Sequence, residues 1–247
     1  MIQDKLISVI VTNYNHAKYI TQALDSLKEQ TYKNLEIIIV DDASTDNSKD
    51  IIEEWNTTNI GVVKRVIYLD KNQGKWSALN TAISQATGDL VTLQDADDVS
   101  CPARIERQLE CLIANKSLHN LCLFSHCYTQ EDIDNNKRYS VYGAPPMMGH
   151  AETTGFVHKG FRTTGINHYY IGPQYEAHGA SSLFYKQLWD HGMKFLPGNM
   201  GLRCQRAEDS DHNTKLTLLL QKTSILLEPQ YCYRRNTSTN GAYLEQL

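Results

Sequence analysis

Two aspartates separated by one residue, Asp95 and Asp97, stand at the end of a short apolar run. Carboxylates held this close repel each other unless a cation lies beside them. Hard oxygen ligands of this kind suit Mg²⁺ or Mn²⁺, which keep part of their water shell and bridge substrate phosphates. The alternative is that Asp95, Asp97 and Asp98 only cap a helix expected to begin near Pro102. The position of the pair after a buried strand favours a metal site.

A second acidic pair, Asp41-Asp42, also follows an apolar run. These carboxylates either bind a ligand or cap the next helix. The stretch from Asp42 to Glu53 also carries oxygen-bearing side chains at the spacing of an EF-hand calcium loop. Position 6 of that loop is Asn47 instead of glycine, and the run before it has the pattern of a strand instead of a helix. A calcium loop is therefore only a minor alternative.

Two further polar turns are candidates for a ligand site. The turn after the first apolar run contains Thr12, Tyr14 and Asn15, and a tyrosine ring there either stacks on a planar base or packs within the turn. Residues 72–75 place a glycine and Lys75 at the start of a helix, where the helix N-terminus and the added charge favour anions. The spacings of a P-loop and of a G-x-G-x-x-G dinucleotide site are both missing.

A third acidic pair, Glu208-Asp209, opens a helical pattern over residues 207–220. A carboxylate at this place can act as a general base toward a substrate hydroxyl. The alternative is an acidic helix start, which the helix dipole favours. The residues alone leave both interpretations open.

An alternation of strand and helix patterns positions the polar groups of the first half. Continuous apolar runs at residues 6–12, 35–40, 65–69 and 90–93 are typical of strands buried on both faces. Amphipathic patterns, with apolar residues three and four apart, lie between them. This order predicts an α/β fold with a mainly parallel sheet flanked by helices. Ligands of such sheets bind at the carboxyl ends of the strands, where the polar clusters fall.

The second half is less regular. Strand patterns return at residues 180–185, 224–227 and 231–233. Residues 129–178 contain many tyrosines, phenylalanines and histidines.

Composition excludes several classes of protein. Lysine plus arginine number 24 and aspartate plus glutamate 28, for a formal net charge of −4, so we expect no nucleic-acid partner. Hydrophobic residues make up 41%, which excludes overall disorder. No apolar run is long enough to span a bilayer, and the N-terminus has no signal-peptide pattern, so we expect a cytoplasmic protein. None of the cysteines forms a C-x-x-C pair, and we expect reduced thiols.

The order of these motifs resembles that of a known family, the family 2 glycosyltransferases with the GT-A fold. The matching segments are Ser8-Val9-Ile10-Val11-Thr12-Asn13-Tyr14-Asn15, Ile39-Val40-Asp41-Asp42-Ala43-Ser44-Thr45-Asp46, Asn72-x-Gly74, Ala78-Leu79-Asn80-x-Ala82, Gly88-Asp89 and Gln94-Asp95-Ala96-Asp97-Asp98. Downstream, Glu208-Asp209 resembles the family's acidic pair and Tyr233-Arg234-Arg235 part of its C-terminal loop. The resemblance is nearly continuous over residues 6–115 and patchy beyond.

The resemblance implies a single domain with a Rossmann-like sheet. Residues 1–128 would bind a nucleotide-sugar, and residues 129–247 would bind the acceptor and supply the catalytic base. Because aromatic rings stack on the apolar faces of sugars, we interpret the aromatic segment 129–178 as an acceptor-binding lid, with an ordinary packed excursion as the alternative. Thr12 and Tyr14 would hold the nucleotide base, with Asn15 in the same binding turn. Asp42 would accept a hydrogen bond from the imide edge of the base, which favours uracil.

The resemblance also implies roles in catalysis. Asp95 and Asp97 would bind a divalent cation, Mn²⁺ or Mg²⁺, with Asp95 also placed to contact the ribose. Lys75 and Arg235, or Arg234 in place of Arg235, would face the nucleotide diphosphate. Asp209, accompanied by Glu208, would take the proton of the acceptor hydroxyl.

We therefore expect a metal-assisted, inverting transfer of a sugar from a UDP-sugar to a glycan or lipid-linked glycan, in the synthesis of a surface polysaccharide. Peripheral association with the inner face of the membrane is compatible with this activity. The alternatives are a nucleotidyltransferase on a related fold and a non-catalytic module that binds a sugar nucleotide or calcium. The sequence leaves the oligomeric state open.

Overall fold

The structure, a computed structural model, describes residues 4–59, 61–127, 139–142, 151–152, 155–156, 182–195 and 223–234. Nearly all of the expected nucleotide-binding half lies within these ranges. Most of the aromatic segment 129–178, the helical pattern 207–220 and Arg235 lie outside them. The predictions that rest on Glu208 and Asp209 therefore concern residues that the structure does not describe.

Strands and helices alternate through the first half, as expected. The strands are β1 (Ile7–Asn13), β2 (Leu35–Asp41), β3 (Val63–Tyr68), β4 (Leu90–Asp95), β5 (Val99–Ser100), β6 (His119–Cys127), β7 (Tyr139–Tyr142), β8 (Ala151–Glu152), β9 (Gly155–Phe156), β10 (Ser182–Tyr185) and β11 (Thr223–Arg234). The helices are α1 (Ile20–Lys28), α2 (Ser48–Thr58), α3 (Lys75–Ser84), α4 (Arg104–Ala114) and α6 (Lys186–Asp190).

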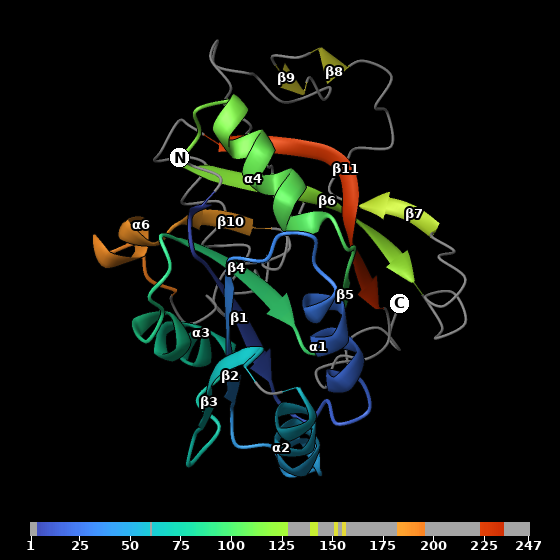
Figure 1. The fold of residues 1–247 in the computed structure, drawn as a ribbon, viewed down its shortest axis with the longest axis vertical. Coiled ribbons are helices and arrows are strands. Elements are labelled where there is room, and N and C mark those ends of the chain that lie inside the picture. The colour runs from blue at the N-terminus through green and yellow to red at the C-terminus, as the bar shows by residue number, and fades with distance from the viewer. Residues whose placement is uncertain are drawn as a thin grey trace, which may run out of the picture.

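Within the described residues, one large sheet runs in the order β3-β2-β1-β4-β10-β6-β11-β5, with β7 paired to β6 (Figure 1). The β1–β2, β1–β4, β2–β3 and β6–β11 pairs are parallel. The β4–β10, β10–β6, β11–β5 and β6–β7 pairs are antiparallel. A mainly parallel sheet flanked by helices is thus confirmed for the first half, and antiparallel strands extend it.

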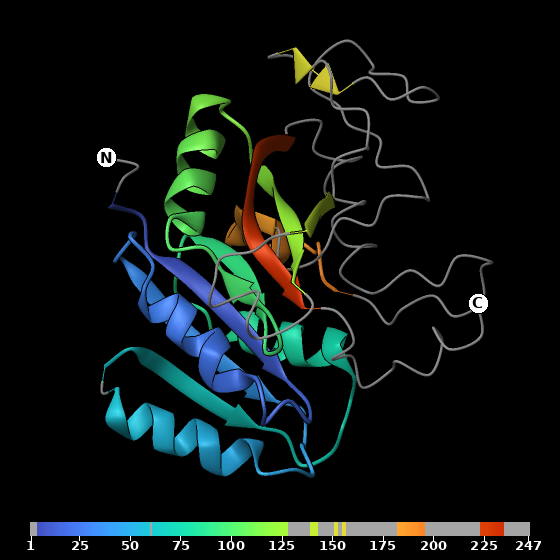
Figure 2. The same cartoon turned by 90° about the vertical axis from the view of Figure 1, so that its right-hand side faces the viewer.

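Helices cover both faces of this sheet (Figure 2). Apolar side chains of α1, α2 and α4 pack with Ile7, Val9 and Val11 of β1 into one core cluster. On the opposite face, α3 and α6 pack with Ile10 of β1 into a second cluster that includes Phe195. Successive strand residues alternate between the two clusters because a strand has a period of two. This alternation decides which polar residues meet at the strand ends.

The sequence patterns placed three features wrongly or missed them. The expected strands at 224–227 and 231–233 form one strand, β11, whose pairing with β6 is irregular on both sides of Pro229. Strand β6 was not predicted. Strand β10 lies near the expected position, but it runs antiparallel to β4 and so interrupts the parallel series.

A buried carboxylate ties three strands together at their amino ends. Glu36 accepts hydrogen bonds from Ser8 Oγ (2.6 Å), Thr87 N (2.6 Å), Thr87 Oγ1 (2.8 Å) and Gly88 N (3.0 Å). Burial by itself would raise the pKa of Glu36, but these hydrogen bonds outweigh it and hold the pKa below its ordinary value. A Cβ on Gly88 would lie 2.6 Å from Ser8 Oγ and 2.8 Å from the Leu6 carbonyl oxygen, so only glycine fits there.

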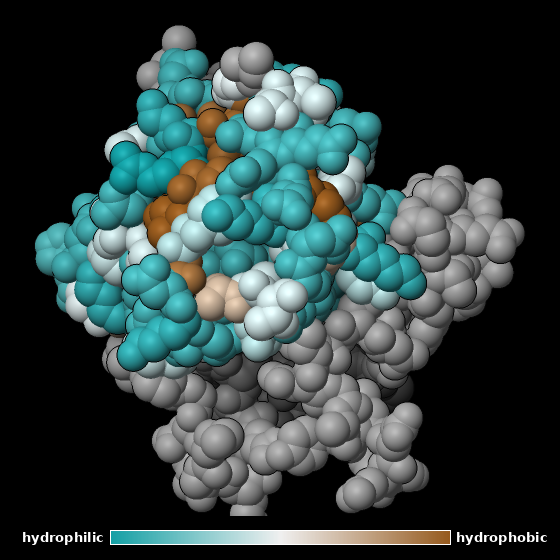
Figure 3. All heavy atoms as spheres, turned by 90° about the horizontal axis from the view of Figure 1, so that it is seen from below, coloured by the Kyte–Doolittle hydropathy of each residue, from teal (hydrophilic) through white to brown (hydrophobic). Residues whose placement is uncertain are grey.

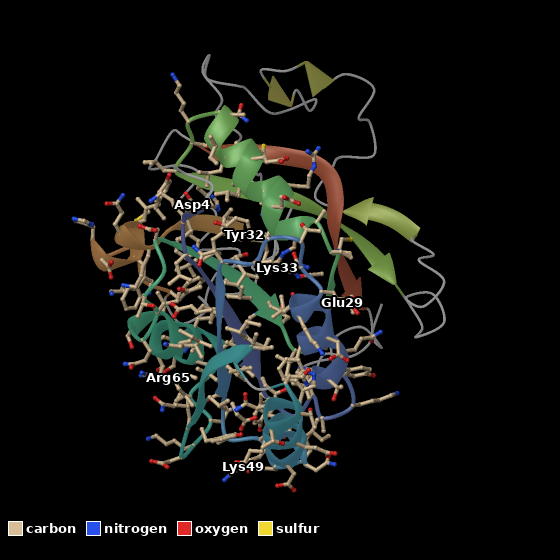
Figure 4. The ribbon with its side chains drawn as sticks, in the orientation of Figure 1. Asp4, Glu29, Tyr32, Lys33, Lys49 and Arg65 are labelled. Carbon is tan, nitrogen blue, oxygen red and sulfur yellow. The ribbon has the colours of Figure 1, made fainter. Side chains whose placement is uncertain are left out.

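Hydrophilic side chains dominate one face of the molecule (Figure 3). Figure 3 shows one face on which hydrophilic side chains surround a smaller hydrophobic area. Charged side chains such as Lys49 on α2 and Arg65 on β3 extend from the sheet and its helices (Figure 4). Cys101 and Cys111 carry free thiols, as expected for these two. No helix in the described ranges is long and apolar enough to cross a membrane.

Candidate functional site

The aspartates at the ends of β2 and β4 are divided between the two faces of the sheet. On β2, Ile38 and Val40 point toward α3. Because every second residue of a strand points to the same face, Asp42 also faces α3. On β4, Val91 and Leu93 likewise place Asp95 on the α3 side. Asp41 lies on the opposite face, with Ile37 and Ile39, toward α1 and α2. The two halves of the Asp41-Asp42 pair therefore belong to different environments.

Asp42 holds the two residues that lead into α3, instead of capping α2, the helix that follows it in the sequence. Its Oδ1 accepts a hydrogen bond from the Gln73 amide (2.8 Å), and its Oδ2 accepts one from the Gly74 amide (2.8 Å). Gly74 immediately precedes α3 and has a φ of +87°, which an L-residue adopts only with strain. Asp42 is only 3% exposed. The anion expected at this helix N-terminus is therefore a carboxylate of the protein itself.

Lys75, the first residue of α3, forms an ion pair with Asp95 at the end of β4. Lys75 Nζ lies 2.8 Å from Asp95 Oδ1, and the two side chains are 29% and 14% exposed. Thr12 of β1 is paired in register with Asp95, which places the first strand end directly beside them. Thr12, Asp42, Lys75 and Asp95 thus converge around the start of α3, from segments far apart in the sequence.

The D-x-D motif forms a tight turn. The Asp98 amide donates to the Asp95 carbonyl oxygen (3.2 Å), and Asp97, between them, is half-buried. No group of three histidine, cysteine, aspartate or glutamate side chains in the described residues could hold a metal. Two carboxylates fit Mg²⁺ or Mn²⁺ only if water and substrate phosphates complete the ligand set, which is the usual arrangement for these ions.

Asp41 organises the turns that follow β1 and β2. Its Oδ2 accepts hydrogen bonds from Asn13 Nδ2 (2.7 Å) and Ser44 Oγ (2.6 Å). Asn15 Oδ1 accepts a hydrogen bond from the Thr45 backbone amide (2.7 Å). The backbone amide of Asn15 donates to Ser44 Oγ (2.9 Å). These contacts fix the turn that also carries Tyr14, which is half-buried.

The calcium-loop alternative is wrong. Helix α2 begins at Ser48, in the middle of the supposed loop. The carboxylate of Asp42 is engaged with Gln73 and Gly74. Asp46 accepts hydrogen bonds from the amides of Ala17 (3.0 Å) and Ser48 (3.0 Å). The spaced oxygen-bearing side chains therefore serve separate hydrogen bonds instead of a shared cation.

The C-terminal strand returns to the D-x-D turn. Tyr231 and Cys232 of β11 pair with Ser100 and Val99 of β5, which directly follows the turn. Because this pairing is antiparallel, the backbone of β11 continues toward the turn up to Arg234, its last residue. Arg235 lies outside the described residues.

Sequence reasoning missed the role of Asn80 on α3. Its Oδ1 accepts from Trp189 Nε1 (2.9 Å) and the Phe195 amide (3.1 Å), and its Nδ2 donates to the Phe195 carbonyl oxygen (2.8 Å). Asn80 stands in one of the segments that carry the family resemblance, but its partners lie more than a hundred residues away and were not predicted. Asn80 fixes where the chain after α6 lies against the second core cluster.

Comparison with known proteins places these features in a family. The family model described as "Glycosyl transferase family 2" matches residues 8–190, well over half of the chain. The chain is 42% identical over 104 residues to an uncharacterized glycosyltransferase of Nostoc sp., covering 42% of this chain. It is 35% identical over 120 residues to the "Putative teichuronic acid biosynthesis glycosyltransferase TuaG" of Bacillus subtilis, covering 49% of this chain. These matches span 32% and 45% of the relatives' own lengths.

Solved structures share the fold. The first 349 residues of S. aureus TarS, in complex with UDP, superpose with a TM-score of 0.68 at 22% identity, over 92% of this chain and 60% of that one. The mannosyltransferase PcManGT of Pyrobaculum calidifontis, in complex with GDP-Man and Mn²⁺, gives a TM-score of 0.63 at 22% identity, over 95% and 58%. At this identity the likeness shows the fold alone, and it confirms the expected GT-A-type sheet.

Proposed function

Because this chain belongs to glycosyl transferase family 2, we propose that it transfers a sugar from a nucleotide-sugar, a UDP-sugar, to a hydroxyl of a glycan. One observation supports this most strongly. The start of α3 gathers Asp42, Lys75 and Asp95 from the ends of β2 and β4, with Thr12 of the intervening strand β1 in register with Asp95. A diphosphate needs a cation there, and a nucleotide base needs polar edges within reach.

The proposed donor site divides into two parts. Thr12, Tyr14 and Asn15 hold the base, and Asp42 accepts from its imide N–H. Each oxygen of the Asp42 carboxylate uses one lone pair for an amide of the α3 start, so a second lone pair remains for the base. The two amides fix the plane of the carboxylate, which suits uracil recognition.

The diphosphate lies in this proposal beside the D-x-D turn. Asp95 and Asp97 hold a divalent cation, Mn²⁺ or Mg²⁺, which stabilises negative charge on the departing diphosphate by several kcal/mol. Lys75 adds a fixed positive charge next to Asp95. Arg235, or Arg234 at the end of β11, adds another from the C-terminal side.

The proposed transfer proceeds with inversion. Asp209, supported by Glu208, takes the proton of the acceptor hydroxyl while the hydroxyl oxygen attacks the anomeric carbon. The bond from that carbon to the diphosphate oxygen breaks on the opposite side, and its electron pair leaves with the nucleoside diphosphate. The products are the glycosylated acceptor and UDP.

The acceptor is proposed to be a glycan or a lipid-linked glycan. A relative is named for teichuronic acid biosynthesis, which supports the assembly of a surface polysaccharide. We assign acceptor binding to residues 129–247, with the aromatic segment 129–178 as its lid. A cytoplasmic location with peripheral membrane association stays a prediction from the sequence.

Product analysis tests this proposal. A thermal-shift panel of UDP, GDP and ADP and of their sugars, with and without Mn²⁺, identifies the donor, because a bound ligand raises the apparent stability. The preferred nucleotide-sugar is then incubated with the protein and Mn²⁺. We expect slow release of UDP. A parallel sample with UTP and a sugar 1-phosphate in place of the nucleotide-sugar tests the nucleotidyltransferase, which would release pyrophosphate as it forms the nucleotide-sugar. Stable binding without any turnover would favour a non-catalytic module.

A further inference from the structure

Gln94 is a fully buried glutamine directly before the D-x-D turn. It has the opposite parity to Asp95 on β4 and therefore points away from α3. Its neighbour in space is Ser100 of β5, which donates from Oγ to Gln94 Oε1 (2.6 Å). Ser100 is itself held by Ser26 of α1, whose Oγ accepts from the Ser100 amide (3.2 Å). The acceptor side of the Gln94 amide is thus fixed by the core.

The Nε2 group of the Gln94 side chain forms hydrogen bonds to both ends of the turn. Gln94 Nε2 donates to the Asp95 carbonyl oxygen (3.0 Å) and to the Asp98 carbonyl oxygen (2.9 Å). The Asp95 carbonyl oxygen also accepts the hydrogen bond that closes the turn, from the Asp98 amide. One buried side chain therefore bridges the turn across which Asp95 and Asp97 are presented.

We propose that Gln94 is a positioning residue that sets the spacing of the Asp95 and Asp97 carboxylates for a divalent cation. The inference rests on the proposed function, because it assumes that these two carboxylates hold the cation. Groups that orient metal ligands from behind typically change metal affinity 10–100-fold when they are removed. Because the proposed cation site draws two carboxylates from the described residues, their relative placement is a large part of what these residues contribute to cation binding.

The test compares two buried glutamines. Gln94→Met keeps the volume of the side chain and removes both donor hydrogen bonds. Gln108→Met is the matched control, since Gln108 on α4 is also fully buried but donates to Asn120 Oδ1 (3.2 Å), away from the turn. Mn²⁺ binding in the presence of saturating UDP is followed by the electron paramagnetic resonance signal of free Mn²⁺. A sample of UDP without protein gives the background.

We expect Gln94→Met to weaken Mn²⁺ binding about 10-fold or more, while Gln108→Met at a similar melting temperature binds within about two-fold of the parent protein. If Gln94→Met does not fold, Ser100→Ala replaces it. This variant frees the Gln94 amide without emptying the site, and we expect a smaller loss in the same direction.

The outcomes separate this inference from the proposed function. If Asp97→Ala loses Mn²⁺ binding while Gln94→Met or Ser100→Ala binds like the parent, the inference is overturned and the proposed function stands. Equal weakening in Gln94→Met and Gln108→Met also overturns it, because the effect would then be a general loss of stability. A parent protein that binds no Mn²⁺ beyond the UDP background overturns both.

Discussion

Lys75 Nζ, on the first residue of α3, lies 2.8 Å from Asp95 Oδ1, on the last residue of β4. The contact places a positive charge beside a carboxylate that we propose holds the divalent cation. Lys75 offsets the charge of Asp95 in the protein alone, and in the proposed function it also faces the diphosphate.

Removing this charge is expected to weaken nucleotide binding. Lys75→Met keeps the length of the side chain and is expected to lower UDP affinity about 10-fold in the presence of Mn²⁺, or about 1.4 kcal/mol. Isothermal titration calorimetry measures the change. Lys5→Met is the control, because Lys5 forms a similar ion pair with Asp89 (3.2 Å) outside the proposed site. UDP affinity in Lys75→Met equal to that in Lys5→Met would contradict a role for Lys75 at the diphosphate.

Asp42 is expected to hold the start of α3 in place. Asp42→Asn keeps one acceptor oxygen and turns an NH₂ group toward a backbone amide, so it should cost about 1–3 kcal/mol. Hydrogen exchange is expected to accelerate at the amides of Gln73 and Gly74. Asp46→Asn, which affects the amides of Ala17 and Ser48 instead, is the matched control. Unchanged hydrogen exchange at the amides of Gln73 and Gly74 in Asp42→Asn would contradict this role of Asp42.

Glu36 makes the stability of the fold dependent on pH. Its pKa in the folded protein lies below the ordinary 4.5, so its contribution is present above that pH and is lost as the pH falls through the lowered value. Glu36→Gln is expected to cost about 2 kcal/mol at pH 7, and the difference from the parent should shrink in acid.

Urea unfolding at a series of pH values measures this dependence. Glu29→Gln, at an exposed position after α1 (Figure 4), is the control and should change little. A difference between parent and Glu36→Gln that stays constant down to pH 3 would mean that the charge of Glu36 contributes nothing.

The proposed general base gives a prediction of a different kind. Asp209→Asn is expected to bind UDP and Mn²⁺ like the parent and to lose sugar transfer, because only proton removal from the acceptor is affected. Glu208→Gln distinguishes the two neighbouring carboxylates and should retain more activity. Transfer at the parent rate in Asp209→Asn would assign the base to another residue.

The sequence predicted the first four strands because their apolar runs are long and bounded by polar turns. It did not predict that β10 runs antiparallel beside β4, since direction depends on where the chain returns. The pattern of β11 was read as two strands because Pro229 lacks an amide hydrogen, and the structure accommodates that residue with irregular pairing. Strand β6 begins with the polar residues His119 and Asn120, both fully buried, and no strand was predicted for this segment.

The residue types of the site were visible in the sequence, but their partners were not. The Asp41-Asp42 pair could be read as helix caps or ligands, and only the alternation along β2 separates them. Asp42 meets amides more than thirty residues away, a contact that no local pattern reveals. The burial of Arg104 and Gln108 could have been predicted but was missed. Their four-residue spacing places both of them in the buried stripe of α4 with Leu112. Nothing in the sequence predicted the contacts of Gln94, apart from its position directly before Asp95.

The central claim is that the Asp95–Asp97 turn binds a divalent cation together with a nucleoside diphosphate. Calorimetric titration of UDP into the parent protein and into Asp97→Ala, each with and without Mn²⁺, tests it most directly. We predict that Mn²⁺ strengthens UDP binding to the parent at least 10-fold and leaves UDP binding to Asp97→Ala unchanged. The same Mn²⁺-dependent gain in both proteins would contradict the claim.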